Sequence, residues 1–468
     1  MKNPTVSQGL EQAYQEVFDI ILSRQDPITG LFPASSDNNH HGDYTDAWVR
    51  DNVYSIQAVW ALALAYGNQE TTLTEAQRSN KYILEHAVIK LMRGLLVSMM
   101  RQADKVESFK RSQHPLDALH AKYKTSSGET VVDDDKWGHL QFDATAIYLL
   151  MLARMTNGGL KIIYTYDEVN FIQNLVHYIG RAYRTPDYGI WERGNKINNG
   201  KPEINASSVG MVRAALTELR GLNLFGEQGD QRSVIHVMTD EIARSKTMLD
   251  SLLPRESLSK QVDSALLSII SYPAFAIQDT SLSQKTRDSI ISTLQGEYGL
   301  KRFLLDGHAT ALEDTSRLHY ENDELKNFES IECEWPLFFT YLALDGIYRS
   351  DEKFTQYYLE KLEKVAVEKN GKRLLPEQYY VPLDKIDAEK AKPHSQVRLP
   401  NNNVPLIWAQ SLWYIAKFLH KGLIQKEQLV IKKNAYCDNQ TCQVKIKVAL
   451  VAHSEFVSKE LEDYGLKN

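Results

Sequence analysis

Apolar residues recur at helical spacing in one segment of the chain after another. In residues 82–99 they form a single stripe along one helix face, and several other segments are apolar nearly all the way round. Helices of the second kind are expected where neighbouring helices bury them on every side. The pattern predicts about a dozen helices. The other clear segments are residues 53–66, 144–153, 169–183, 209–219, 234–249, 335–348, 357–367 and 404–419.

Long polar or Gly/Pro-marked stretches separate these predicted helices. They cover residues 25–46, 103–139, 185–203, 299–328 and 370–403. Loops of this length inside a compact domain are usually functional. Helices that alternate with such loops predict an all-α fold, a toroid of helical hairpins whose loops build a pocket on one face.

The pattern changes near the C-terminus. Residues 444–450 alternate apolar and polar side chains, and residues 429–433 offer a partner strand, so we expect a β-hairpin there. Ser454 has the character of an N-cap for a short helix that Gly465 ends. We therefore predict one large helical domain over residues 1–424 and a small α+β appendage, a hairpin plus a helix, over residues 425–468.

Composition and charge exclude several classes of partner. Of the 468 residues, 43% are hydrophobic and 24% are charged, which is ordinary for a globular protein with a large core. The net charge of −6 and a pI near 6.1, without a basic stripe, argue against a nucleic-acid partner. The sequence has no apolar run of membrane-spanning length, roughly 18 residues, and no signal-like start. We expect no membrane partner.

The cysteines and the recognised motifs add little chemistry. Three cysteines occur, Cys333, Cys437 and Cys442, an odd number that fits a reducing cytoplasm. We expect free thiols, the alternative being a bond between the last two across a tight turn. The sequence has no P-loop and no Cys/His cluster with metal spacing, so we expect no cofactor and no metal. The acidic run at residues 133–135 is expected to be an exposed turn rather than a calcium site.

Four loop segments each combine an aromatic side chain with a charged group. The apolar face of a pyranose stacks on an aromatic ring, while its hydroxyls require bidentate carboxylate or guanidinium partners. This pairing therefore favours a carbohydrate ligand. The segments are Trp48-Val-Arg50-Asp51, Trp137-Gly-His139-Leu-Gln141-Phe-Asp143, Tyr188-Gly-Ile-Trp191-Glu192-Arg193 together with Asn205-Ala-Ser-Ser208, and Leu375-Pro-Glu377-Gln378-Tyr379.

Two glutamates in these segments have the character that glycoside hydrolysis needs. One carboxyl group must be kept protonated by apolar surroundings and the other must stay ionised. Glu192 beside Trp191 fits the first role, and Glu377 beside Gln378 and Tyr379 fits the second.

Several charged residues of the chain also have a simpler, purely structural interpretation. Arg50 and Asp51 begin an apolar helix, where such a pair usually forms a cap with a local ion pair. Residues 332 and 334, both Glu, are more typical of buried partners of an Arg or of backbone amides than of catalysts. Residues 40–41, both His, fit a solvated loop.

The same four segments resemble, in the same order, glycoside hydrolase family 15, the glucoamylases. This resemblance implies an (α/α)6 six-hairpin barrel, with Glu192 as general acid and Glu377 as general base. Residues 405–408 resemble the start of the helix that follows the base. The resemblance further implies a set of substrate-binding residues: Trp48, Arg50, Asp51, Trp137, His139, Gln141, Trp191, Arg193, Gln378 and Tyr379.

A closer resemblance, over nearly the whole chain, is to the N-terminal domain of the α and β regulatory subunits of phosphorylase kinase. It is carried by segments such as Gly30-Leu-Phe-Pro33, Leu119-His-Ala-Lys122 and Arg317-Leu-His-Tyr320. Position 193 is Arg, as in those subunits, where glucoamylases often have an acidic residue. A guanidinium near Glu192 would favour its carboxylate and oppose a protonated general acid.

Two functional hypotheses follow. The first is an inverting, exo-acting α-glucosidase that releases glucose from the non-reducing ends of α-1,4-glucans or maltooligosaccharides. The alternative is a catalytically silent glucan-binding regulatory module of glycogen metabolism. A protein partner, a kinase or calmodulin, belongs only to this alternative. The sequence ends at Asn468 without the long C-terminal regions of the kinase subunits or a prenylation cysteine, so we do not expect these partners from this chain alone.

Overall fold

A computed structural model describes most of the chain. The described residues are 4–34, 38–39, 42–43, 45–136, 138–191, 200–226, 229–317 and 319–430, with Ser454, Val457 and Lys459 near the C-terminus. The chain divides into two compact units, Met1–Ile431 and Lys432–Asn468. The fold and the site described below belong to the first unit.

Six of the described helices form a closed inner ring. In ring order they are α2 (Val49–Gly67), α5 (Phe142–Asn157), α7 (Ala206–Leu219), α9 (Leu267–Ile270), α12 (Leu337–Arg349) and α15 (Ile407–His420). Each packs on the next, and α15 returns to pack on α2. This ring is the inner layer of an (α/α)6 toroid, which confirms the predicted all-α fold.

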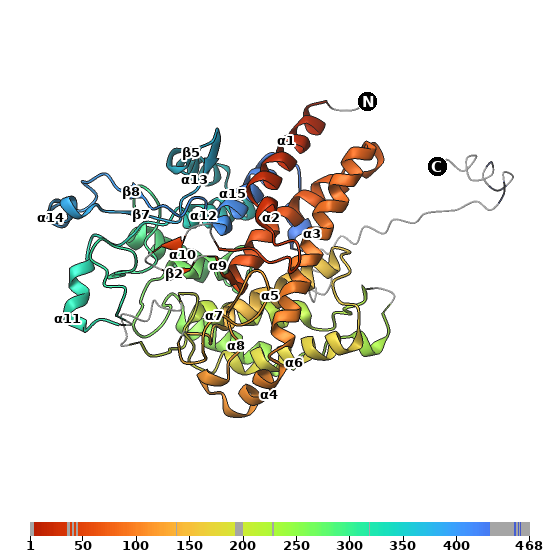
Figure 1. The fold of residues 1–468 in the computed structure, drawn as a ribbon, viewed down its shortest axis with the longest axis horizontal. Helices are drawn as coiled ribbons and strands as arrows, with labels where there is room; N and C mark the ends of the chain where they lie inside the picture. The colour runs from red at the N-terminus through yellow and green to blue at the C-terminus, as the bar shows by residue number, and fades with distance from the viewer. Residues whose placement is uncertain are drawn as a thin grey trace. The chain divides into compact units, whose positions relative to one another are not determined.

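An outer helix precedes each inner helix in the chain. The outer helices are α1 (Pro4–Ile20), α3 (Glu75–Met100), α6 (Tyr166–Ala182), α8 (Thr239–Leu252), α10 (Thr280–Leu294) and α13 (Glu352–Val365). One additional helix, α4 (Ala103–Ser112), packs on α6. Figure 1 shows α4, α6 and α8 together along the lower edge of the molecule.

Burial explains which helices are inner and which are outer. In α5 every residue from Phe142 to Thr156 is buried, because the segment is apolar on nearly all sides. The outer α13 buries one stripe, formed by Thr355, Tyr358, Leu359, Leu362 and Val365. A helix buried on one face lies at the periphery, and a helix buried on all faces lies in the ring.

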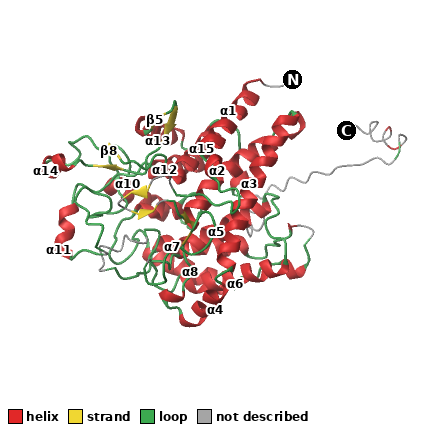
Figure 2. Ribbon diagram, viewed as in Figure 1, coloured by secondary structure: helices red, strands yellow, loops and turns green. Residues whose placement is uncertain are grey.

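Short elements connect the helices on the two ends of the toroid. Figure 2 shows that the strands are short compared with the helices. Four two-stranded antiparallel ladders occur among the described residues: β1 (Asn38–Asn39) with β2 (Gly42–Asp43), β3 (Ala47–Trp48) with β4 (Lys122–Tyr123), β5 (Val367–Lys369) with β6 (Lys372–Leu374), and β7 (Tyr379–Tyr380) with β8 (Leu399–Pro400). The short helices α11 (Asn322–Leu325), α14 (Ile386–Ala391) and α16 (Lys426–Leu429) complete the unit.

Some predicted elements were wrong. Helix α4 lies inside the predicted loop 103–139, and the predicted helix 234–249 begins only at Thr239. Helix α10 was missed because part of its buried face is polar, formed by Ser283, Thr286 and Arg287. Residue 429 ends helix α16 instead of starting a strand.

The predicted C-terminal appendage lies almost entirely outside the described residues, as do Cys437 and Cys442. Ser454 Oγ accepts a hydrogen bond of 3.4 Å from Val457 N, as an N-cap side chain does. The domain boundary after residue 424 stays a prediction. Cys333 is a buried free thiol.

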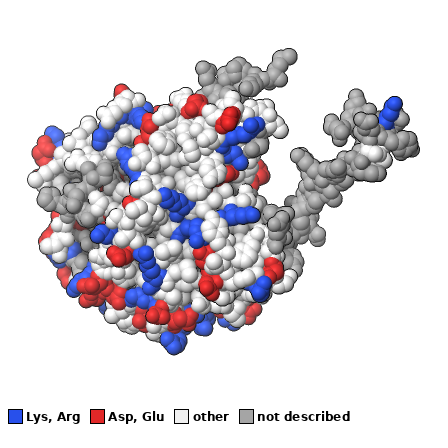
Figure 3. All heavy atoms as spheres, turned by 45° about the vertical axis from the view of Figure 1, so that its right-hand side comes forward, with Lys and Arg blue, Asp and Glu red and all other residues white. Residues whose placement is uncertain are grey.

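Acidic and basic side chains lie beside one another on the face of the molecule shown in Figure 3. This mixed pattern differs from the concentrated basic surface of nucleic-acid-binding proteins. Among the helices in the described ranges, none combines the length and the apolar character that crossing a bilayer requires.

Candidate functional site

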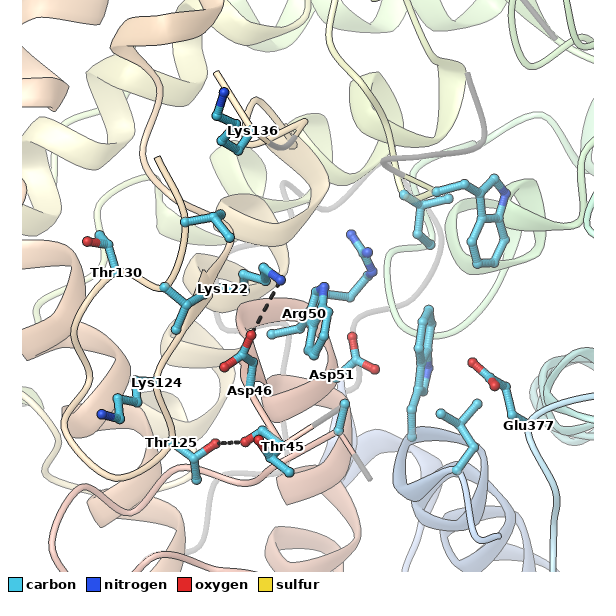
Figure 4. Close-up of a pocket in the computed structure, with 18 of the residues that line it drawn as sticks. Thr45, Asp46, Arg50, Asp51, Lys122, Lys124, Thr125, Thr130, Lys136 and Glu377 are labelled. Atoms are coloured by element: carbon cyan, nitrogen blue, oxygen red, sulfur yellow. Dashed lines mark hydrogen bonds and ion pairs between the residues drawn. The ribbon is translucent and has the colours of Figure 1, made fainter. Parts of the chain in front are cut away.

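The inner helices begin around a common cavity. Trp48 is the N-cap of α2, Leu406 is the N-cap of α15, and Pro336 is the N-cap of α12. The cavity, of about 930 Å³, lies among these helix starts and the loops that precede them, with Glu377 at one side (Figure 4). Its lining includes Trp48, Arg50, Asp51, Trp191, Arg302, His308, Trp335, Glu377, Leu406 and Trp408.

Arg50 is fixed between two inner helices. Its Nη1 donates to Asp143 Oδ2 at 2.9 Å and to Gln141 Oε1 at 3.1 Å. The side chains of Arg50 and Asp143 are each 4% exposed. Its guanidinium lies 5.9 Å from the ring centroid of Trp408. The ion pair therefore joins α2 to α5, and it holds the guanidinium at the cavity wall, where Asp51 also lies.

Trp48 forms a second part of the wall. Strand β3 pairs with β4 so that Trp48 lies opposite Lys122, and Lys122 Nζ sits 4.9 Å from the Trp48 ring centroid. The same ammonium group is 3.4 Å from Asp46 Oδ2. The indole is thus held in place by a cation on one ring face, which is a favourable contact for an aromatic ring.

Trp191 stands in a frame of buried charge and aromatic rings. Its Nε1 donates to both carboxylate oxygens of Asp263, at 2.9 and 3.1 Å. The Arg302 guanidinium lies 5.0 Å from the Trp191 ring centroid and 5.4 Å from that of Trp335. Asp306 accepts two hydrogen bonds from Arg302, at 2.6 and 2.9 Å. Two indoles and one bidentate guanidinium therefore form a rigid corner of the cavity.

A buried aspartate anchors the segment that leads to Trp191. Asp187 accepts hydrogen bonds from Asn205 Nδ2 at 2.8 Å, from Ser208 Oγ at 2.7 Å and from Phe142 N at 3.1 Å. Burial raises the pKa of Asp187 to about 7, although the hydrogen bonds from Asn205 and Ser208 lower it. The contacts join this segment to the starts of α5 and α7.

Asp187 predicts a pH dependence of stability. Because its pKa is higher in the folded chain than in the unfolded chain, the folded state binds the proton more tightly, and stability from this group is lost as the pH rises from about 4 to about 7. An Asp187→Asn variant removes this titration, so its stability relative to the wild type should rise by about 1.4 kcal/mol per pH unit in that window. Urea unfolding at several pH values measures the difference. A difference that does not change with pH would contradict the assignment.

Two predicted segments meet at a glycine. Tyr188 N donates to Leu140 O at 2.8 Å, and a Cβ on Gly138 would lie 2.7 Å from the Tyr188 ring. Only glycine permits this approach without a shift of the ring. The loop that contains His139 and Gln141 is therefore packed against the segment that contains Trp191.

Glu377 points into the cavity from the loop before β7 (Figure 4). Its side chain is largely buried, with 5% exposure of the residue. Asn401 Nδ2 donates to Glu377 Oε2 at 2.7 Å, and Glu377 N donates to Asn403 O at 3.0 Å. The carboxylate is therefore oriented by the residues that connect β8 to α15.

The structure brings together some of the predicted site residues and leaves others outside the cavity. Trp48, Arg50, Asp51, Trp191 and Glu377 line it. Gln141 does not line the cavity but accepts a hydrogen bond from Arg50, which does. Trp137, Glu192 and Arg193 lie outside the described residues, as do residues 40–41.

Three predicted ligand-contacting residues are buried but do not line the cavity. His139 stacks on His120 with 3.8 Å between ring centroids, and burial lowers the pKa of His139 to about 3. Tyr379 donates its hydroxyl to Val365 O at 2.6 Å, and Gln378 has 2% exposure. None of His139, Gln378 and Tyr379 is among the residues that line the cavity.

The simpler interpretation of the two other glutamates is confirmed. Glu334 Oε1 lies 3.1 Å from Arg398 Nε, and Glu334 Oε2 accepts from Tyr298 N at 2.8 Å. Glu332 Oε2 accepts from Lys301 Nζ at 2.7 Å. Both are buried ion-pair partners.

The acidic run at residues 133–135 is an exposed turn in which Asp134 accepts from His120 and pairs with Lys105. Within the described part of the chain, no group of three or more His, Cys, Asp or Glu residues is arranged to hold a metal ion.

Sequence reasoning missed Arg302, His308 and Trp335, which come from the predicted loop 299–328 and from the residues just before α12. Trp408 was assigned only as part of a helix start. The available signal was the same pairing of aromatic and charged residues, but here Arg302 and Trp335 are far apart in the sequence and become neighbours only through the backbone pairing of Leu300 with Trp335.

Comparison with known proteins agrees with this geometry. The sequence profile described as Glycosyl hydrolases family 15 matches residues 8–434. The chain belongs to this family. Within glycosyl hydrolases family 15, it is similar to the rabbit phosphorylase b kinase regulatory subunit alpha, skeletal muscle isoform, with 51% identity over 95% of the chain and 36% of the relative. A probable phosphorylase b kinase regulatory subunit alpha of Drosophila melanogaster is 48% identical over 97% of the chain and 36% of the relative.

The chain thus spans about a third of the length of these curated relatives. Among solved structures, a wild-type glycosidase superposes with a TM-score of 0.62 and 16% identity, covering 91% of this chain and all of the glycosidase. This match shows the shared six-hairpin fold. The family-15 fold is therefore established, and the relatives at about half identity are named as regulatory subunits of phosphorylase b kinase.

Proposed function

We propose that the chain is a regulatory module that binds the non-reducing end of an α-1,4-glucan or maltooligosaccharide in the cavity. The observation that carries the proposal is the cavity wall, where indole rings stand beside the fixed guanidinium of Arg50 and the carboxylates of Asp51 and Glu377. Aromatic faces and bidentate charged groups are the partners that a pyranose needs.

The similarity to regulatory subunits favours binding of a glucan, rather than its hydrolysis, as the function. Over almost the full length of this chain, about half of its residues are identical to those of the relatives. In a longer protein, a bound glucan end would report the presence of glycogen-like polymer to a partner such as a kinase. The chain spans only about a third of those relatives, so the existence of such a partner is part of this proposal.

Hydrolysis with inversion is the second candidate, and Glu377 favours it. Its carboxylate lies in the cavity and is held by a neutral amide donor, as a general base would be. Glu192 would then protonate the leaving oxygen, with about 6.5–9.5 Å between the two carboxyl groups. Arg193 beside Glu192 in the sequence opposes that role.

Titration calorimetry with maltopentaose, together with a glucose assay and polarimetry on the same samples, separates the two. We expect saturable binding of maltopentaose and of acarbose without release of glucose. Release of β-glucose by the wild type that is lost in a Glu377→Gln variant would establish the hydrolase instead. Absence of binding to both oligosaccharides would overturn the proposal that the cavity is a glucan site.

A further inference from the structure

The two carboxylate oxygens of Glu377 have different surroundings. Oε2 accepts the hydrogen bond from Asn401 Nδ2 at 2.7 Å. Among the described residues, the hydrogen bond from Asn401 is the one found at this carboxylate, and no Lys, Arg or His side chain forms an ion pair with it. Since Glu377 lines the cavity, the arrangement commits one oxygen to the protein and leaves the other toward the cavity.

The position of Asn401 follows from the backbone register of the loop. Strand β7 pairs with β8 so that Tyr379 lies opposite Pro400, and Asn401 N donates to Gln378 O at 3.0 Å. Glu377 N donates to Asn403 O at 3.0 Å on the other side of the contact. The amide of Asn401 is therefore placed against Glu377 by a ladder that brackets both residues.

Several polar side-chain atoms of residues 378–403 have no protein partner. In the described part of the chain, Gln378 Oε1, Asn401 Oδ1 and both amide atoms of Asn403 are buried and have no hydrogen-bond partner. Asn403 has 0% exposure. Buried polar groups normally have partners, so these amide atoms are free to bind water or a ligand.

A neutral donor has a different effect from a cation. An ion pair with Lys or Arg would orient Glu377 but would also offset its negative charge. An amide N–H orients the carboxylate and leaves its charge available to a ligand. A ligand that carries positive charge near the sugar ring, or develops it, would benefit from that charge.

We propose that Asn401 is a positioning residue of the cavity, which holds Oε2 of Glu377 and thereby turns Oε1 toward the bound sugar. The inference rests on the proposed function of the cavity as a glucan-end site. It adds a residue of the predicted loop 370–403 that lies outside the cavity lining and was not among the predicted site residues.

The test uses acarbose, an oligosaccharide with a basic nitrogen, and three variants. Asn401→Ala removes the donor. Asn401→Asp keeps the shape but replaces the donor by a carboxyl group. Asn402→Asp is the matched control, because it adds the same group at the neighbouring exposed position, whose side chain makes no described hydrogen bond to Glu377.

We expect Asn401→Ala to weaken acarbose binding by roughly 10- to 100-fold, the usual effect of losing a hydrogen bond to a charged group. Asn401→Asp should bind weakly at about pH 8 and recover as the pH falls to about 5, because two carboxyl groups in contact share a proton and restore an O–H···O bond. The Asn402→Asp control should stay within about 2-fold of the wild type at both pH values.

The outcomes separate this proposal from the proposed function. If the wild type binds acarbose and Asn401→Ala binds equally well, or Asn401→Asp shows no acid recovery, the positioning role is wrong. If the wild type binds neither acarbose nor maltopentaose, the glucan-site proposal fails. Crystal structures of the wild type and Asn401→Ala then decide separately, since an unchanged Glu377 carboxylate orientation in the variant would also overturn the positioning role.

Discussion

An Arg50→Ala variant should bind acarbose roughly 10- to 100-fold more weakly than the wild type, because it removes the hydrogen bonds that a charged group would donate to the sugar, which contribute about 1.5–3 kcal/mol. Arg50 is the guanidinium that lines the cavity and is held by Asp143 and Gln141. The same change should lower the free energy of unfolding by about 3–5 kcal/mol, since it leaves Asp143 buried without its cation. Calorimetry and urea unfolding measure the two effects.

The control for this prediction is another buried arginine. Arg287 Nε lies 2.7 Å from Asp345 Oδ2, with 7% and 4% exposure, and Arg287 does not line the cavity. Arg287→Ala should therefore destabilise the fold but leave acarbose affinity within about 2-fold of the wild type. Equal losses of affinity in both variants would show that Arg50 acts only through stability.

The second large effect is expected at Arg398, whose replacement by Ala should lower the free energy of unfolding by about 3–5 kcal/mol. Arg398 has 3% exposure and bridges two buried glutamates, Glu334 at 3.1 Å and Glu389 at 3.4 Å. It also donates to the carbonyl oxygens of Glu332 and Ser330. The variant leaves two buried carboxylates without their shared cation.

This loss should extend to the cavity. Glu334 and Tyr379 exchange backbone hydrogen bonds of 2.9 and 2.8 Å, and Tyr379 follows closely after Glu377. Arg398→Ala should therefore weaken acarbose binding as well as unfold at lower urea concentration. Arg317→Ala, which removes a bidentate pair with the partly exposed Glu324, is the control and should cause a much smaller loss. Similar stabilities of the two variants would contradict the central role assigned to Arg398.

The fold was largely predictable because its signal is local. A helix buried on all sides, such as α5, is apolar along its whole length, and that property can be read from consecutive residues. Helix α10 was not predictable in this way, since Arg287 on its buried face is satisfied by Asp345 of another helix. The packing of α10 depends on a residue far away in the sequence, which the pattern of consecutive residues cannot predict.

The site was predictable to the extent that its residues are neighbours in the sequence. Trp48, Arg50 and Asp51 stand together at one helix start, and all three line the cavity. Arg302 and Trp335 become neighbours only when Leu300 pairs with Trp335. Tyr379 shows the converse, because a residue adjacent to the site in sequence can turn its side chain into the core.

The arrangement of the inner helices has a further consequence for how such a domain changes over time. Several groups that face the cavity belong to connecting segments or to the first turns of ring helices, while the remainder of each ring helix is occupied with packing. Substitution of a few residues in those connections can therefore abolish catalysis and retain ligand binding without any repacking of the ring helices. By this route a hydrolase could become a receptor for its own substrate while the packing of its helical ring stays the same.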